Sequence, residues 1–224
     1  MGCAAVLAMA AGVTDVAAQG AFEPEGCWSE DERIEPDTEA ENVFLFPQWE
    51  TAPDMVIDED ADYTAVIETN KGDMTFDLNI EAAPVAVNNF ICLANNGFYD
   101  IVPFHRVIEG FMVQSGDPTG TGAGGPGYRF EDELPGDDLD YTRGTLAMAN
   151  AGPDTQGSQF FIVHADLPAD FPRDYTIFGE LVEGEDVLDD IADSAVVPSL
   201  QGEPSRPVEF VVIEDITILE ESGS

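Results

Sequence analysis

Residues Phe104 to Asp117 read FHRVIEGFMVQSGD, a run that places a basic pair, His105 and Arg106, shortly before Phe111, Met112 and Gln114. The pairing is unusual because the chain is strongly acidic. Asp and Glu number 46 against 7 Lys and Arg, which gives a formal net charge of −39. A cationic side chain kept beside large apolar residues in such a chain is a candidate for a functional group.

The net charge also excludes several classes of partner. A surface this negative repels nucleic acid phosphates and anionic lipid headgroups, so we expect no nucleic acid partner.

The negative charges of the surface also repel one another, and salt screens this repulsion. The near absence of lysine, with Lys71 alone, favours a salt-adapted (halophilic) protein. A moderately acidic secreted protein is the alternative.

The length and composition predict one well-packed domain. The chain has 224 residues, of which 44% are hydrophobic, enough for a core in one domain but few for two. The three cysteines, Cys3, Cys27 and Cys92, do not suggest a disulfide framework. Cys92 lies in an apolar periodic run and is expected to be a small buried hydrophobe. No Cys or His cluster indicates a metal, and we expect no cofactor.

The N-terminal residues MGCAAVLAMAAGVTDVAA are small and apolar, but they lack the basic start of a signal peptide. Cys3 would be a lipid-acceptor cysteine if the true start lay upstream. We therefore expect an extracytoplasmic protein, with a cytoplasmic location as the alternative. If the true start lies upstream, we expect a lipid anchor at Cys3.

The chain divides into three parts. Residues 1–61 are predicted to be an apolar N-terminus followed by an irregular acidic, Pro-containing extension or linker, whose FLFPQW aromatics pack onto the domain. Residues 62–220 form the ordered domain, and 221–224 a tail. We expect a monomer.

Patterns within the domain favour a mainly β fold. YTAVIETNKGDMTFDL (63–78) has the alternation and central turn of a β-hairpin. EAAPVAVNNFICLANNG (81–97) and GEDVLDDIADS (184–194) have apolar residues at helical spacing. The runs FHRVI, FMVQSG, TLAMAN, QFFIVH, TIFGEL and VEFVVIEDITIL read as strands. Many short strands with two helices predict a closed barrel with helical caps.

The residues that carry chemistry include a fixed cation, amides and aromatics, without a recognisable nucleophile. The glycine run TGTGAGGPG lacks the lysine of a phosphate-binding loop. Such a set suits binding or a non-covalent rearrangement. Four motifs, FHRVIEGFMVQSGD, GTGAGGPG, GTLAMANAGPDTQGSQFFI and YTIFGELVEG, resemble those of the cyclophilin-type peptidyl-prolyl cis-trans isomerases. The resemblance covers about residues 63–219. The resemblance implies a closed eight-stranded antiparallel β-barrel capped by two α-helices.

The resemblance also assigns site residues. Arg106 falls at the catalytic arginine, and the apolar pocket for the substrate proline falls on Phe111, Met112 and Phe161. The remaining substrate-binding positions are Gln114, Ala149, Asn150, Ala151, Gln159, Phe171 and Tyr175. The match loosens in ADLPADFPRDY (165–175), where Phe171 lies nearest to the family's tryptophan–leucine pair and Tyr175 replaces a common histidine. The absence of the tryptophan argues against tight cyclosporin binding.

The implied function is isomerisation of X-Pro bonds in proline-containing peptides and in unfolded or folding proteins. Four alternatives stay open, two for the function of the domain and two for its site residues. The domain could be a catalytically weak proline-binding module that acts as a chaperone or scaffold, or a carrier for an acidic N-terminal segment that docks a basic partner. Arg106 itself could be a structural ion-pair partner, and Phe111, Met112 and Phe161 could be plain core. His105 is expected to hold its strand by hydrogen bonds, and His164 to have no role.

Overall fold

The architecture comes from a computed structural model, which describes residues 21–34 and 46–221. A nine-stranded sheet, with order β3-β11-β1-β2-β8-β6-β7-β5-β4, curls around the main core. Neighbouring strands are antiparallel throughout. The strands are β1 (Asp62–Thr69), β2 (Gly72–Leu78), β3 (Val102–Pro103), β4 (Arg106–Ile108), β5 (Met112–Ser115), β6 (Thr145–Met148), β7 (Phe160–Val163), β8 (Ile177–Glu183) and β11 (Val212–Glu221). The mainly β prediction is confirmed.

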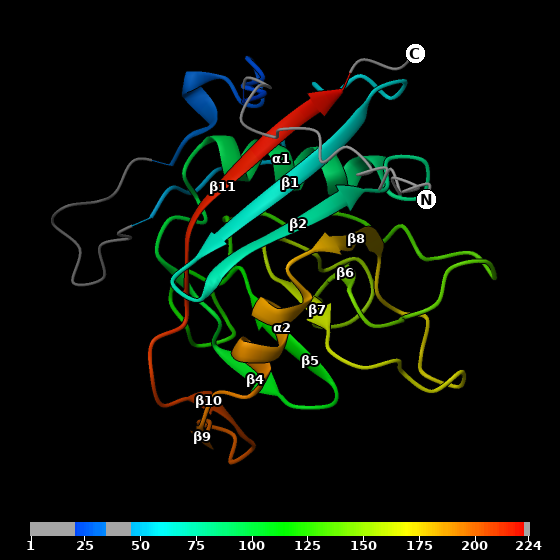
Figure 1. Ribbon diagram of the computed structural model, residues 1–224. Coiled ribbons are helices and arrows are strands. Elements are labelled where there is room, and N and C mark those ends of the chain that lie inside the picture. Colours follow the sequence, from blue (N-terminus) through cyan, green and yellow to red (C-terminus); the bar gives the residue numbers. More distant parts are fainter. Residues whose placement is uncertain (1–20, 35–45, 222–224) are drawn as a thin grey trace, which may run out of the picture.

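The β1–β2 hairpin forms for a local reason. Its alternating residues bury one face, as the pattern in β1 shows, and the turn between Thr69 and Gly72 is closed by the Thr69 hydroxyl, which donates to the Gly72 carbonyl at 2.6 Å. β1 then pairs on its other side with β11, the last strand among the described residues. Figure 1 shows β11, β1 and β2 side by side as long, twisted arrows.

The two ends of the sheet belong to one continuous run of chain. β3 and β4 are the outermost strands in the order, yet only Phe104 and His105 separate them. The Phe104 N–H donates to the Val211 carbonyl at 2.9 Å, whereas the His105 N–H donates to the Gln114 carbonyl at 3.1 Å. The chain therefore passes from one edge of the sheet to the other within two peptide units.

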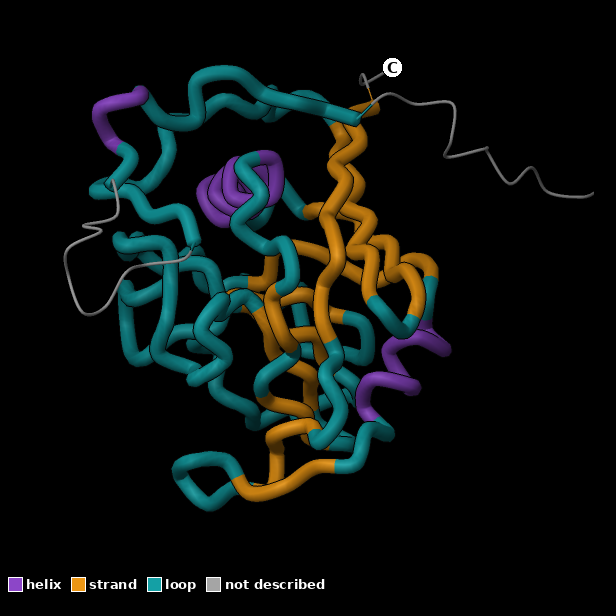
Figure 2. The backbone as a smooth tube through the Cα atoms, turned by 90° about the vertical axis from the view of Figure 1, so that its left-hand side faces the viewer, coloured by secondary structure: helices purple, strands orange, loops and turns teal. Residues whose placement is uncertain are grey.

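The two predicted helices are both present. α1 (Pro84–Asn95) has Pro at its first turn and buries an almost continuous face, including Phe90, against β11 and β8. α2 (Glu185–Ala192) buries Leu188 and Ile191 and packs against β2, β4 and β5. The two helices lie at separate places around the sheet (Figure 2).

A hairpin that was not predicted follows α2. It consists of β9 (Val196–Pro198) and β10 (Pro204–Pro207), which form a small sheet of their own. β10 lies against β4, the strand that carries Arg106. In Figure 1 this hairpin is at the lower end of the molecule, next to β4.

The described residues of 21–34 and 46–61, here called the strap, run along the domain. They contain one short 3-10 turn, Glu30–Glu32, and no longer regular element. Ala21 forms a bridge with Leu219, and the Trp49 N–H donates to the Pro126 carbonyl at 2.9 Å. Trp49 is 3% exposed and belongs to the main core. The aromatics of FLFPQW that the structure describes, Phe46 and Trp49, thus pack into the domain; the others lie outside the described residues.

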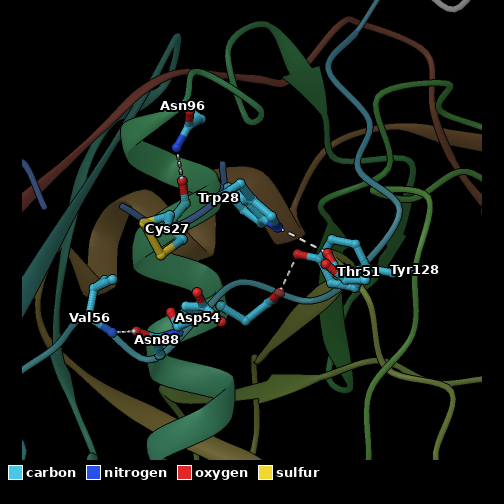
Figure 3. The surroundings of a disulfide bond; sticks show 10 residues. Cys27, Trp28, Thr51, Asp54, Val56, Asn88, Asn96 and Tyr128 are labelled. Atoms are coloured by element: carbon cyan, nitrogen blue, oxygen red, sulfur yellow. Dashed lines mark hydrogen bonds between the residues drawn. A yellow bond between two sulfur atoms is a disulfide. The ribbon is translucent and has the colours of Figure 1, made fainter. Parts of the chain in front are cut away.

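The prediction for the cysteines was wrong. Cys92 is fully buried as expected, but its sulfur is bonded to Cys27 of the strap. Beside this disulfide, the Val56 N–H donates to Asn88 Oδ1, and Asn88 donates in turn to the Asp54 carbonyl, both at 2.9 Å. Figure 3 shows the strap fastened to α1 through these groups. Cys3 lies outside the described residues.

Within the described ranges, no helix has the length and apolar character needed to cross a bilayer.

Candidate functional site

The pairing of three strands brings the first predicted site residues into one row. Arg106 of β4 is opposite Gln114 of β5, and Gln114 is opposite Phe161 of β7. Residues directly opposite on adjacent strands project from the same face of a sheet. The motifs around 104–117 and 144–162, which are distant in sequence, are therefore placed side by side by sheet register.

The predicted apolar residues gather in a cluster that is separate from the main core, here called the apolar cluster. Its buried members are Met112, Tyr141, Ala147, Phe161, Val163 and Ile177, and its half-buried members include Phe111, Ala149, Phe171 and Tyr175. The Phe171 and Tyr175 rings stack at 5.9 Å, and the Phe161 ring meets Tyr175 edge-on at 5.4 Å. These aromatics form a second packing centre on the face of the sheet that carries Arg106.

Phe161 is more buried than the assignment as a pocket wall suggests. It is 6% exposed, and Met112 is 2% exposed, whereas Phe111 is half-buried. In this arrangement, Phe161 and Met112 form the floor of the apolar cluster, while Phe111 and Phe171 offer accessible edges.

The polar predicted residues, Gln114, Asn150 and Gln159, line a cavity of about 1020 Å³. The Gln114 amide donates to Gln159 Oε1 at 3.0 Å, and Gln159 Nε2 donates to the Gly124 carbonyl at 2.9 Å. Ala149, Asn150 and Ala151 line the same cavity, and the Ala149 N–H donates to the Gln159 carbonyl at 2.9 Å. Every predicted substrate-binding residue thus lies in the apolar cluster or on this cavity, and Ala149 contributes to both.

The strap contributes to the cavity in a way that the sequence did not reveal. Phe46 and Gln48 line it, and Gln48 Nε2 donates to the Gly125 carbonyl at 3.2 Å. The local sequence of the strap has no periodic pattern and therefore predicts only a linker or wrapping segment. Only the tertiary structure shows that it forms one wall of the cavity.

Arg106 contacts the apolar cluster, and its cross-strand neighbour Gln114 lines the cavity. Three groups surround its guanidinium. Its carbon is 5.8 Å from the centre of the Phe111 ring, and Nη1 points to Met112 Sδ at 3.7 Å. Glu203, in the loop of the β9–β10 hairpin, accepts hydrogen bonds from Nε at 2.7 Å and Nη2 at 3.0 Å. The ion pair that the sequence left open as an alternative is therefore present, and it coexists with the contacts expected of a site arginine.

Tyr141 is a further residue that the sequence analysis missed. Its hydroxyl donates to the Tyr175 carbonyl at 2.7 Å and accepts from the Tyr175 N–H at 3.1 Å. These two bonds fix the backbone that presents Tyr175 to the apolar cluster. Nearby, the Asn150 amide donates to the Asp174 carbonyl at 2.7 Å, so the Asn150 loop and the Tyr175 loop are held together.

The two histidines differ from expectation. Neither ring nitrogen of His105 has a hydrogen-bond partner among the described residues, and burial lowers its pKa, so the ring is a neutral packing group. His164, for which no role was expected, lies directly after the end of β7 and makes structural contacts. Its Nδ1 accepts from the Gly110 N–H at 2.8 Å and its Nε2 contacts Asp189 of α2 at 2.9 Å, so it ties the β4–β5 turn to α2.

The glycine-rich loop is organised by Asp117, the last residue of the opening motif. This fully buried carboxylate accepts hydrogen bonds from the backbone N–H groups of Thr119, Thr121 and Gly122. Burial alone raises the pKa of Asp117, but the hydrogen bonds outweigh it and hold the pKa below its ordinary value. Just before it, Gly116 has φ 83°, and a Cβ there would lie 2.2 Å from the Ser158 carbonyl oxygen, so only glycine fits.

We expect Asp117→Asn to lower the free energy of unfolding by about 2 kcal/mol at pH 7, because an amide accepts these hydrogen bonds less strongly than a carboxylate. The depressed pKa makes the stabilisation fully present above the unfolded pKa of about 4 and lost as the pH falls through the folded value. Urea titrations at several pH values should show the gap between wild type and variant closing below about pH 4. Asp137→Asn, at an exposed carboxylate, is the control; a gap independent of pH would contradict the role of the charge.

The assembled groups can bind a peptide but are not arranged to attack one. Arg106 supplies fixed N–H donors, the apolar cluster supplies a dry surface, and the cavity supplies amide and backbone groups. Across the part of the chain that the structure describes, no group of three or more His, Cys, Asp or Glu side chains is placed to hold a metal ion.

Comparison with known proteins agrees with this geometry. Residues 64–218 match the family model of the cyclophilin type peptidyl-prolyl cis-trans isomerases. A peptidyl-prolyl cis-trans isomerase of Helicobacter pylori is 46% identical over 138 residues, covering 61% of this chain and 84% of its own. A Staphylococcus epidermidis relative named for the same activity is 42% identical over 192 residues, covering 72% of this chain and 94% of its own.

Solved structures give the same result. A cyclophilin type peptidyl-prolyl cis-trans isomerase of Cryptosporidium parvum superposes with a TM-score of 0.65 at 38% identity, covering 70% of this chain and 97% of its own. A second structure of that protein, in the presence of the dipeptide Ala-Pro, has a TM-score of 0.64 at 39% identity and covers 69% of this chain and 98% of its own.

Proposed function

The chain belongs to the cyclophilin-type peptidyl-prolyl cis-trans isomerases, and we propose that Arg106 is the group with which it accelerates rotation of X-Pro bonds. The single observation that carries this assignment is the position of the guanidinium. It contacts Phe111 and Met112 of the apolar cluster, and Arg106 is the cross-strand neighbour of Gln114, which lines the cavity together with Gln159.

The chemistry of the X-Pro bond explains why a cation is useful there. Rotation is opposed by amide resonance, with a barrier of about 18–20 kcal/mol, so uncatalysed exchange takes roughly tens to hundreds of seconds. Twisting localises the lone pair on the prolyl nitrogen, which then accepts a hydrogen bond. A guanidinium is always protonated, so Arg106 donates more strongly to the twisted transition state than to the planar ground state.

The surrounding groups hold the substrate on both sides of that bond. We assign the proline ring to the accessible edge of the apolar cluster, at Phe111 and above Met112 and Phe161. The residues preceding proline run past Gln114, Gln159 and the backbone of Asn150 along the cavity. The presence of Ala-Pro with the Cryptosporidium parvum relative supports a proline dipeptide as ligand here.

A direct test is an isomerisation assay on a short proline peptide with the full chain. Turnover well above the uncatalysed rate supports the proposal. The rival, a proline-binding module without useful turnover, predicts saturable peptide binding with no rate enhancement. The same sample examined by peptide titration and by rate therefore separates the two. As an isomerase, the protein would act on unfolded and folding proteins, with no cofactor.

We also infer that the functional domain is larger than residues 62–220. The strap places Trp49 in the core, lines the cavity through Gln48 and is bonded to α1 at Cys92.

The barrel is proposed to be closed by the continuous chain from β3 to β4. The disulfide, a bond that persists in oxidising compartments, supports an extracytoplasmic location.

The charge of −39 is proposed to be an adaptation to salt. Folding crowds the carboxylates that an expanded chain spreads apart, and the Debye length falls from about 30 Å at 0.01 M to about 3 Å at 1 M salt. We expect Tm to rise steadily from low salt to beyond 1 M sodium or potassium chloride, with activity following the folded fraction. A non-ionic co-solute is the control. Equal Tm and activity at 0.01 M and 2 M salt would contradict the adaptation.

A further inference from the structure

We propose that Glu203 is a positioning residue that holds the Arg106 guanidinium in its working orientation. The inference rests on the proposed role of Arg106 and extends it to a residue from a different part of the fold. Glu203 is separated from Arg106 by 97 residues, and it reaches the site only because the β9–β10 hairpin lies against β4.

The carboxylate of Glu203 engages one edge of the guanidinium and leaves Nη1 without a bond to it. The carboxylate engages Nε at 2.7 Å and Nη2 at 3.0 Å, which is one edge of the guanidinium. Nη1 lies on the other side, toward Met112 Sδ at 3.7 Å, and so faces the apolar cluster in which the proline ring is placed. Glu203 therefore fixes the plane of the guanidinium without occupying the N–H groups of Nη1.

A bidentate partner matters because an arginine side chain is long and mobile. A half-exposed arginine without such a contact samples many rotamers, whereas a fork-to-fork pair with a carboxylate holds the planar group in one orientation. The Phe111 ring at 5.8 Å restricts the same group from a third direction. A correctly oriented donor raises the rate because the substrate then meets it without further reorganisation.

Glu203 is itself held in place by the hairpin. The Ser199 N–H donates to the Glu203 carbonyl at 2.7 Å, and the Gly202 N–H donates to the Ser199 carbonyl at 3.0 Å. Gly202 turns the chain with φ 89°, a conformation that favours glycine. The hydrogen bonds from Arg106 hold the pKa of the Glu203 carboxyl below its ordinary value, so the group is a carboxylate at neutral pH.

The test is a double-mutant cycle on turnover. We expect Glu203→Ala to lower kcat/KM by about tenfold, the effect of losing a charge-assisted hydrogen bond, through kcat and with KM little changed. Glu203→Gln, which keeps one acceptor, should fall between wild type and Glu203→Ala. In an Arg106→Ala background, Glu203→Ala should have no further effect, because there is no guanidinium left to orient.

The control is Glu209→Gln, which removes one exposed negative charge shortly after the hairpin and should leave turnover unchanged. Measurement of Tm for each variant shows whether the hairpin still folds. A Glu203→Ala protein that turns over as fast as wild type or faster overturns the inference. The inference also fails if Glu203→Ala lowers kcat/KM by the same factor in the Arg106→Ala background as in wild type. If Arg106→Ala turns over normally, the proposed catalytic role of Arg106 fails together with the positioning role of Glu203. If Arg106→Ala is inactive and Glu203→Ala is fully active, only the positioning role of Glu203 is refuted.

Discussion

Arg106→Ala is expected to lose about 99% of kcat/KM while remaining folded. The side chain supplies a charge-assisted hydrogen bond that is made chiefly in the transition state, and removing such a donor costs about 3 kcal/mol, or roughly a hundredfold in rate. The loss should appear mainly in kcat, because the apolar cluster and the cavity still bind the peptide.

The fold should tolerate this substitution because the side chain is half-exposed, and its ion pair with Glu203 is only partly shielded from solvent, with side-chain exposures of 34% and 39%. Arg206→Ala is a matched control, since Arg206 is an exposed arginine on β10, the strand that lies against β4. Rates should be measured with both variants at equal folded fraction. Near-normal turnover by folded Arg106→Ala would refute the assigned mechanism.

Removal of the Cys27–Cys92 disulfide should destabilise the protein by about 4 kcal/mol, the chain-entropy value for a loop of this size. The bond joins residues separated by 65 positions and links the strap to the buried face of α1. Without it, the unfolded chain gains freedom, and the strap is held by its hydrogen bonds and by the packing of its apolar residues, including Trp49 and Ile57.

The measurement is urea unfolding in molar salt with and without a reductant. Wild type should lose stability on reduction, and a Cys27→Ala, Cys92→Ala double variant should start at the lower stability and not respond to the reductant. Cys3→Ser, at a cysteine outside the described residues, controls for effects of the third thiol. A double variant as stable as oxidised wild type would show that the strap is fastened by its other contacts alone.

Local signals in the sequence predicted the elements that depend on neighbouring residues. The alternation of 63–78 with its turn predicted β1 and β2, and Pro84 with the helical spacing that follows predicted α1. The β9–β10 hairpin was missed because Val196–Pro198 and Pro204–Pro207 are short and proline-bounded, with no alternation to read. The main sheet has nine strands, where the resemblance implied eight. β3 and β4 count separately because the chain between them pairs first with one edge of the sheet and then with the other.

The sequence predicted those residues of the candidate site that belong to contiguous motifs. Arg106, Gln114 and Phe161 were assigned by resemblance, and the register of β4, β5 and β7 brings them together. Glu203 and Gln48 were not found, because their relation to the site depends on contacts over long sequence separations that no local pattern encodes. The same reason applies to the bond between Cys27 and Cys92.

The position of β11 within the sheet has a consequence for how the protein is made. β11 is the last strand among the described residues, yet it lies between β3 and β1, and its long register with β1 joins residues at opposite ends of the domain. A nascent chain therefore exposes the edge of β1 until residues 212–221 have been synthesised, and such non-local pairing slows folding. The β1–β11 pairing therefore forms only after every other strand of the nine-stranded sheet has been synthesised.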